Sequence, residues 1–532
     1  MSTPMNVAVL QETPAAPPIP GLVGKARVPP PFPLPYVLGR FGWRWWTGLA
    51  ALTVVTGLGV AAYALQMTRG LAVTGLGNLG QGGAAWGVYI AFDIYFVGAS
   101  FAGISIAALT RLFDIKHLKP ISRMAELVAI LSLLMGTLCV LADLGRPLEG
   151  LLSLPRYART QSPFFGTFSL VVATYLFASF VYLFLDGRED AARCALLGGR
   201  LARFHTWWAC GYRGTPSERR RRSRASFWLA VLILPLLVAA HSTLGLIFGL
   251  QGGRPGWFSS LQGPSFVVMA GVSGIGLIVV VAGLARRLLR LETRIPRSTF
   301  RWLGNSLFVL CAVYLYLMVI EGLTATYAAP QAEARVARQV MVGQYAPIFW
   351  SVVGGLACAA ALMFVQFLRG GSSIGWTMLA GLLANAASIL KRYLIVVTGQ
   401  THGLQPQLPS GRYVPSWVEV CIVTGLLALG ASLFLVFVKL FPILPLVPDV
   451  EAPPEGEGAD IRRGWDLRRV LFCAAPLGLG LALAIVGFLG SARVGTQSHL
   501  DPVIPFSPVI FILGLILCFA TALVYEILPD RN

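Results

Sequence analysis

The chain carries twelve apolar runs, each long enough to cross a lipid bilayer, and this feature restricts its fold more than any other. A helix rises 1.5 Å per residue, so about 20 residues span the roughly 30 Å of a hydrocarbon core. In lipid every backbone N–H and C=O group needs a partner within the protein, and helices provide one locally. We therefore expect an all-α polytopic membrane protein with about twelve transmembrane helices. The expected spans are Trp45–Met67, Ala85–Leu112, Ser122–Asp143, Phe164–Leu185, Phe227–Leu250, Pro264–Leu284, Trp302–Leu323, Ile348–Leu368, Ile374–Thr398, Val414–Val438, Val470–Leu489 and Val509–Ile527.

Composition and segment pattern divide the chain into four parts. Of the 532 residues, 56% are hydrophobic and only 12% are charged, which is typical of an integral membrane protein. We expect a disordered Pro-rich cytoplasmic tail over residues 1–43, a ten-helix membrane domain over 44–440, an acidic Pro-rich linker over 441–466 and a two-helix hairpin over 467–532. The second to fifth and the sixth to ninth spans are expected to form two four-helix bundles, with the other helices flanking them.

Positive charge is distributed unevenly between the two sides of the predicted membrane domain. If the N-terminus lies in the cytoplasm, nine of the 42 Lys and Arg residues fall on the outer side and 31 on the inner side. Because basic loops stay in the cytoplasm, this asymmetry predicts that both termini are cytoplasmic. We expect the membrane to be a bacterial inner membrane. The net charge of +19 is then explained by loops that face anionic membrane lipids, and no nucleic-acid partner is expected.

The chain has few residues that suit a resident redox cofactor. Its eight Cys include no Cys-x-x-Cys pair, and most lie inside apolar runs, as small buried side chains do. Of its five His, only His241 lies inside a clear span, whereas two b-type haems with paired His ligands need four. We therefore expect no haem, no iron–sulfur cluster and no metal site in this chain.

Ionisable side chains gather in the outer half of the predicted membrane domain, where such groups are candidates for function. Asp93 lies roughly 13 Å deep on the second span, and Tyr89 shares its helix face. Asp143 and Arg146 end the third span, three residues apart, and can also form a simple ion pair. His241 lies in the outer half of the fifth span. Since a His beside a carboxylate in an apolar pocket suits proton transfer, we expect His241 to pair with Asp143 or Asp93.

The other charged residues within the spans have a structural alternative. Four of them are expected in ion pairs between helices: Glu321, Lys391, Arg392 and Glu419. For example, Arg392 and Glu419 face each other across the loop that joins their spans. On the inner side, Glu126 can begin a proton path towards Asp93. Alternatively, Glu126 pairs with Arg123 or Lys119 at the helix start, where an acid is favourable in any case.

Several short motifs occur in an order that resembles a known family. The most specific is Asp143-Leu-Gly-Arg-Pro147. The others are Trp86-Gly-Val-Tyr89, Arg123-Met-Ala-Glu126, His241-Ser-Thr-Leu-Gly-Leu-Ile-Phe-Gly249, Arg254-Pro-Gly-Trp-Phe258, Lys391-Arg-Tyr393 and Tyr413-Val-Pro-Ser-Trp-Val-Glu419. Over about residues 44–440 the chain resembles the NrfD/polysulfide-reductase membrane subunit family, in the branch of DsrP- and HybB-like subunits and the quinol subunits of alternative complex III.

This resemblance implies a quinol- or quinone-binding subunit of a respiratory oxidoreductase complex, with menaquinone or ubiquinone as its substrate. Such subunits exchange electrons with an extracytoplasmic ferredoxin-like iron–sulfur subunit, which serves a molybdopterin subunit or a multihaem cytochrome. The resemblance assigns quinol contact to His241 and Asp143, and support of that site to Arg146 and Asp93. Tyr89, on the same helix face as Asp93, is expected to take part in quinone binding as well. Two other classes stay open: a secondary transporter, which the spans and buried charges also suit, and a purely structural anchor that binds no quinone.

Overall fold

A computed structural model describes residues 38–39, 41–77, 83–157, 174–196, 200–328, 330–402, 411–446, 467–490 and 503–528. Within these ranges the chain forms fifteen α-helices and no β-strand. Eleven of the helices are long and apolar enough to cross a membrane. The predicted all-α, multi-pass membrane fold is therefore confirmed. Most of the predicted tail and linker, and residues 164–173 of the expected fourth span, lie outside the described residues.

The eight central helices form the two predicted bundles. The first consists of α2 (Val88–Leu112), α3 (Ser122–Asp143), α6 (Leu176–Leu196) and α8 (Pro216–Gly249). The second consists of α9 (Gln262–Leu288), α10 (Arg297–Leu323), α12 (Ala346–Leu368) and α13 (Ile374–Thr401). Helix α9 packs against α2, α8 and α13, and so joins the bundles. Helix α2 contacts neighbours on several sides, which places its polar residues in the interior of the protein.

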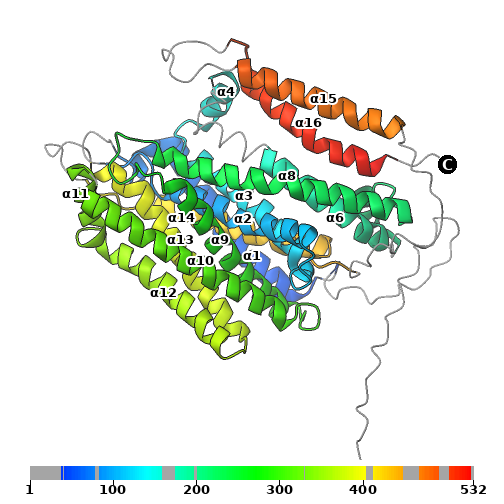
Figure 1. Ribbon diagram of the computed structural model, residues 1–532, viewed down its shortest axis with the longest axis horizontal. Helices are drawn as coiled ribbons and strands as arrows, with labels where there is room; N and C mark the ends of the chain where they lie inside the picture. The colour runs from blue at the N-terminus through cyan, green and yellow to red at the C-terminus, as the bar shows by residue number, and fades with distance from the viewer. Residues whose placement is uncertain are drawn as a thin grey trace, which may run out of the picture.

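Two helix pairs flank these bundles. Helices α1 (Trp43–Arg69) and α14 (Trp417–Leu440) pack together, and α14 also contacts α3. Helices α15 (Leu467–Gly490) and α16 (Ser507–Ile527) form the predicted C-terminal hairpin, and α16 packs on α6 and α8. Figure 1 shows this hairpin, in orange and red, at one edge of the molecule, and α12 at the opposite edge. The hairpin thus extends the first bundle.

Three shorter helices lie in segments that were predicted to be loops: α4 (Pro147–Tyr157), α7 (Ala202–Ala209) and α11 (Gln331–Met341). Helix α3 ends at Asp143 as predicted. Pro147, expected only to stop that helix, is the first residue of α4, where its fixed φ and missing N–H are tolerated. Helix α7 packs on α6, and Trp208 stacks on Phe441 with ring centroids 4.6 Å apart.

The closest helix contact in the first bundle depends on a glycine. A Cβ atom at Gly103 on α2 would lie 2.2 Å from the backbone oxygen of Ala125 on α3. Only glycine allows the two backbones to approach this closely, as is common where helices pack in membranes. Gly103 therefore positions α2 directly against α3, whereas Gly98, five residues earlier, faces Ser273 and Ala270 on α9.

One end of the bundles, which we call the basic end, holds Arg219–Arg222 at the start of α8 and the start of α3. There Arg123 donates to Asp186 at 3.0 Å and to Asp190 at 2.5 Å. All three side chains are buried. The fourth span was expected to end at Leu185, and charged residues follow it in the sequence. Helix α6 continues to Leu196, and its charged side chains are paired inside the protein.

A second buried ion pair fastens the C-terminal hairpin at the same end. Arg188 on α6 donates to Glu526 on α16 at 2.8 Å, and both side chains are almost completely buried. The same guanidinium donates to the backbone oxygens of Ala209 and Cys210, at 3.2 and 3.1 Å. The α16 contact therefore relies on one charged interaction that water does not screen.

We expect Glu526→Gln to loosen the hairpin, because Arg188 then stays buried without a counter-charge. Breaking such a pair costs several kcal/mol, reduced here by the two carbonyl contacts, so we expect a loss of about 2 kcal/mol. Hydrogen exchange should become at least tenfold faster in α16 but not in α9. Glu292→Gln, an exposed acid at the basic end, is the control. Unchanged exchange in α16 would show that apolar packing alone holds the hairpin.

Candidate functional site

Three carboxylates lie in the half of the bundles opposite the basic end, each within electrostatic range of the next. We call Asp93 on α2, Asp143 on α3 and Glu419 on α14 the acidic cluster. Asp143 lies within electrostatic range of both Asp93 and Glu419. The α2–α3 and α3–α14 contacts bring these helices together. The structure thus gathers two of the predicted site residues, with a third acid that was predicted to form an ion pair.

A hydrogen-bonded chain holds the wall of this cluster. The hydroxyl of Tyr89 donates to Gln66 Oε1 at 2.6 Å, and Gln66 Nε2 donates to the backbone oxygen of Ala142 at 2.7 Å. Tyr89 and Gln66 are both almost fully buried. The contact with Ala142 fixes the last turn of α3, so the side chain of Asp143 is presented from a rigid position.

The two aspartates have free acceptor capacity. Asp143 Oδ1 is buried and has no hydrogen-bond partner among the described residues. Asp93 Oδ1 faces α3 at Gly136, where an added Cβ atom would lie 3.1 Å from it. A buried carboxylate without a hydrogen-bond donor is unfavourable, and it gains from a ligand hydroxyl or from a proton. The pair is therefore suited to accept protons from a hydroxyl group that enters the cluster.

Glu419, by contrast, is bound by several donors. It accepts the hydroxyl of Tyr413 at 2.5 Å and the backbone N–H groups of Gly75 and Ser416 at 2.6 and 2.8 Å. Burial and the charge of Glu419 raise the pKa of Tyr413, so that hydroxyl stays protonated and donates. Glu419 thus joins the start of α14 to the loop before α2. The predicted pair of Glu419 with Arg392 is wrong, because the described contacts of Glu419 all lie elsewhere.

His241 lies on a different side of α2 from the acidic cluster. Its Nδ1 is 2.8 Å from the backbone oxygen of Leu237, and its Nε2 is 3.0 Å from that of Val97. In the described part of the chain it forms no ion pair with Asp143 or Asp93, so the predicted pairing is wrong. A neutral imidazole has one N–H and donates to one carbonyl, whereas the protonated ring donates to both. The neutral ring therefore donates to one of these two carbonyls.

Arg146 and Glu126 have different surroundings from those predicted for them. Arg146 is exposed and pairs with Glu149 at 3.3 Å, on the first turn of α4, so it does not pair with Asp143. Glu126 is completely buried, and both carboxylate oxygens lack a hydrogen-bond partner within the described residues. Its expected partners are engaged elsewhere, Arg123 with two aspartates and Lys119 with Asp114. Arg111 and Arg123 nevertheless lie within electrostatic range of this carboxyl.

The second bundle holds its own charged residues around a cavity of about 130 Å³. On the wall of this cavity Lys391 donates to Glu321 at 3.0 Å, which is an ion pair between helices of the kind predicted for these residues. Helix α11 closes the cavity, and its Glu333 accepts the backbone N–H of Gly256 at 2.6 Å. Arg392 points away from it and lies over the ring of Phe266, 4.1 Å from the centroid.

Two uncharged residues beside the acidic cluster, Gln66 and Tyr413, were not predicted as site residues from the sequence. A search for charged residues within apolar runs passes over both. A usable signal was present, because Gln66 is a polar residue near the end of an apolar run and falls at the same membrane depth as Asp143. No group of three or more His, Cys, Asp or Glu side chains suited to a metal ion occurs within the described ranges.

Comparison with known proteins gives a consistent set of similarities. The family model for polysulphide reductase, NrfD, matches residues 78–403. A putative dimethyl sulfoxide reductase membrane subunit from Halobacterium salinarum is 30% identical over 442 residues, which is 79% of this chain and 96% of that protein. A selenate reductase subunit from Mesobacillus selenatarsenatis is 25% identical, over 74% of this chain and 93% of its own. The Hdr-like menaquinol oxidoreductase integral membrane subunit of Archaeoglobus fulgidus is 27% identical, over 74% and 92%.

Proposed function

The chain belongs to the polysulphide reductase NrfD family, and from this premise we propose that it is a quinol- or quinone-binding membrane subunit of a respiratory oxidoreductase complex. The names of its relatives support this proposal: two are subunits of reductases and one is a subunit of a menaquinol oxidoreductase. In the proposal, the basic end faces the cytoplasm of a bacterial cell. An extracytoplasmic iron–sulfur subunit, serving a molybdopterin subunit or a multihaem cytochrome, docks on the other side.

One observation supports the choice of site. Asp93 and Tyr89 lie within electrostatic range of Asp143, and the Oδ1 atom of Asp143 has no hydrogen-bond partner in the described structure. Oxidation of a quinol releases two electrons and two protons. In the proposal a quinol hydroxyl donates to Asp143, and Asp143 and Asp93 take the two protons as the electrons pass one at a time to the docked subunit. The apolar surroundings strengthen such hydrogen bonds.

We assign His241 and Arg146 roles that are less direct than those implied by the family resemblance. Because His241 contacts backbone oxygens on another side of α2, we assign it a secondary role, as an acceptor for protons that have left the quinol. Arg146 lies at the exposed start of α4. There it contributes to the entrance of the site or to docking of the partner subunit. We assign direct quinol contact to Asp143, Asp93 and Tyr89.

Glu126 gives the proposal an additional proton-transfer branch. A protonated, buried carboxyl near the basic end can supply protons to the acidic cluster. Glu126 lies ten residues before Gly136, which faces Asp93, and this separation is about 15 Å along α3. Such a distance needs intermediate hydroxyl groups or waters, and the buried hydroxyls of Ser132 and Ser105 lie on the two helices concerned.

A binding titration tests the proposal. We expect a quinol-analogue inhibitor, a hydroxyquinoline N-oxide, to quench the fluorescence of the purified subunit in a saturable manner, since its thirteen Trp give ample signal. Asp143→Asn should weaken binding about tenfold, because a hydrogen bond to a charged group contributes about 1.5 kcal/mol or more. His241→Gln should change affinity less than threefold, since its ring lies apart from the cluster.

The controls separate this function from the two alternatives. Glu149→Gln, an exposed acid just beyond Asp143, should bind the inhibitor like the wild type. A folded protein that shows no saturable quenching would reject the quinol site and favour the structural anchor or the transporter. If the Asp143→Asn variant binds the inhibitor as tightly as the wild type, the proposed function stands but the site lies elsewhere. The cavity lined by Lys391 and Glu321 is then the next candidate.

A further inference from the structure

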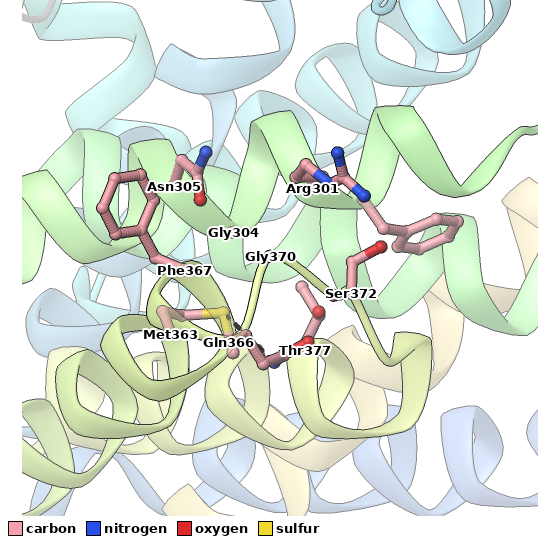
Figure 2. A pocket seen from close by; sticks show the side chains of 11 residues that line it. Arg301, Gly304, Asn305, Met363, Gln366, Phe367, Gly370, Ser372 and Thr377 are labelled. Atoms are coloured by element: carbon pink, nitrogen blue, oxygen red, sulfur yellow. Dashed lines mark hydrogen bonds between the residues drawn. The ribbon is translucent and has the colours of Figure 1, made fainter.

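A cavity of about 190 Å³ lies at the basic end of the second bundle, and none of the residues of the acidic cluster lines it. Figure 2 shows Arg301 and Asn305 on α10 facing the end of α12, the start of α13 and the turn that joins them. One water takes up about 30 Å³ in the liquid, so the cavity has room for a small polar group and its nearest waters. It lies where three candidate membrane spans begin or end.

The lining of this cavity carries positive charge and no acid. Arg301 is its only ionisable residue, and in the described part of the chain it has no carboxylate within ion-pair distance. Asn305, one turn further along α10, adds an amide, and Ser372 adds a hydroxyl from the turn. Gln366 also lines the cavity, and its Oε1 accepts the backbone N–H of Ser373, just before α13, at 2.6 Å. This set of donors is suited to an oxyanion with several acceptor oxygens.

The turn between α12 and α13 keeps the cavity open. Gly370 has a φ of +62°, which glycine adopts at no steric cost. A Cβ atom at Gly370 would meet no other atom within 4 Å, and one at Gly371 would meet only the oxygen of Arg369. The turn is therefore open at both glycines.

Apolar side chains form the remaining walls and favour a lipid over a free ion. Phe300 and Met363 are buried at the base, whereas Phe367 is 61% exposed at the rim. A polar group seated at Arg301 can thus continue as an acyl chain past Phe367 into the bilayer. Further Arg residues surround the site on the same side of the protein: Arg286, Arg287, Arg290, Arg294, Arg297 and Arg369. Basic clusters of this kind attract anionic lipids.

We propose that this cavity binds the phosphate group of an anionic phospholipid, with Arg301 as the charged contact and Asn305 and Ser372 as hydrogen-bond donors. The site stands independently of quinol chemistry. An anionic lipid there bridges α10 to the α12–α13 turn. Since those three helices make up most of the second bundle, the lipid stabilises the bundle at its basic end.

The test uses the full-length protein, delipidated in detergent, and native mass spectrometry with added cardiolipin, phosphatidylcholine or inorganic phosphate. We expect saturable cardiolipin binding to the wild type. Each Arg near a membrane surface contributes about 1 kcal/mol to such binding, so Arg301→Gln should raise the Kd of the tightest cardiolipin about fivefold. Arg297→Gln, one turn earlier on α10 and outside the cavity lining, is the matched control and should change the Kd less than twofold.

Three outcomes would overturn the proposal. Equal weakening by the two Arg variants would show that the basic surface as a whole binds the lipid. If phosphatidylcholine binds as tightly as cardiolipin and Arg301→Gln leaves both Kd values unchanged, the cavity does not select a negatively charged headgroup. Inorganic phosphate that displaces cardiolipin at millimolar concentration and protects the protein from heat equally well would identify a site for free phosphate. A Ser372→Ala variant, which removes one donor on an exposed turn, gives a second measurement if Arg301→Gln folds poorly.

Discussion

Asp143→Asn is expected to slow quinol oxidation by the assembled complex about 100-fold or more. The two side chains have nearly the same shape, and Asn still forms hydrogen bonds, but its amide does not take up a proton. General-base catalysis typically contributes 100- to 10,000-fold to a rate. Asp93 can replace part of this function, because it lies close enough to interact with Asp143 electrostatically. The loss should therefore fall at the lower end of that range, and it should appear mainly in kcat.

The measurement is steady-state oxidation of a soluble menaquinol analogue by the purified complex, with single and double variants of the two aspartates. Asp143→Asn combined with Asp93→Asn should lose more activity than either change alone, because each carboxylate then has no substitute. Glu149→Gln, whose side chain is exposed at the same end, should retain at least half of the wild-type activity. If Asp143→Asn keeps more than a third of the activity with normal assembly, Asp143 does not accept the proton.

The membrane spans could be predicted from the sequence because lipid imposes a simple rule on it. A helix in hydrocarbon needs about 20 apolar residues, and the runs that meet this length are visible without any knowledge of packing. Asp93 and Asp143 could also be placed in the same half of the membrane, because depth along a straight helix follows from residue number. Orientation of the protein in the membrane stays a prediction from the distribution of Arg and Lys.

Contacts between helices could not be predicted in the same way, because they depend on the rotation of each helix about its axis. His241 and Asp143 share a membrane half in the sequence. In the structure α8 turns His241 towards the backbone of Val97, and α3 turns Asp143 towards Tyr89 and Glu419. A rotation of about 100°, which is one residue along a helix, is enough to change the partner. The continuation of α6 beyond Leu185 could not be predicted for a related reason, since a charge that is paired inside a protein resembles an exposed charge in a hydropathy profile.

The buried charges at the basic end show how strongly the first bundle depends on such pairing. Arg123 is 2% exposed and binds two aspartates from α6, while its guanidinium also donates to the backbone oxygen of Pro442 at 3.3 Å after α14. Its charge lies 5.7 Å from the ring centroid of Phe441. One side chain thus joins α3, α6 and the segment that follows α14.

Arg123→Ala should therefore destabilise the protein by about 3–5 kcal/mol, because it leaves Asp190 and part of Asp186 buried without their counter-charge. Arg123→Lys should recover only part of this loss, since one ammonium group cannot bind two carboxylates with the geometry of a guanidinium. The free energy of unfolding in mixed detergent, followed by Trp fluorescence, gives the measurement. Lys119→Ala, which breaks the exposed pair with Asp114 on the segment just before α3, is the control and should have a much smaller effect. Equal stability of Arg123→Ala and Lys119→Ala would mean that water reaches the Arg123 network and screens its charges.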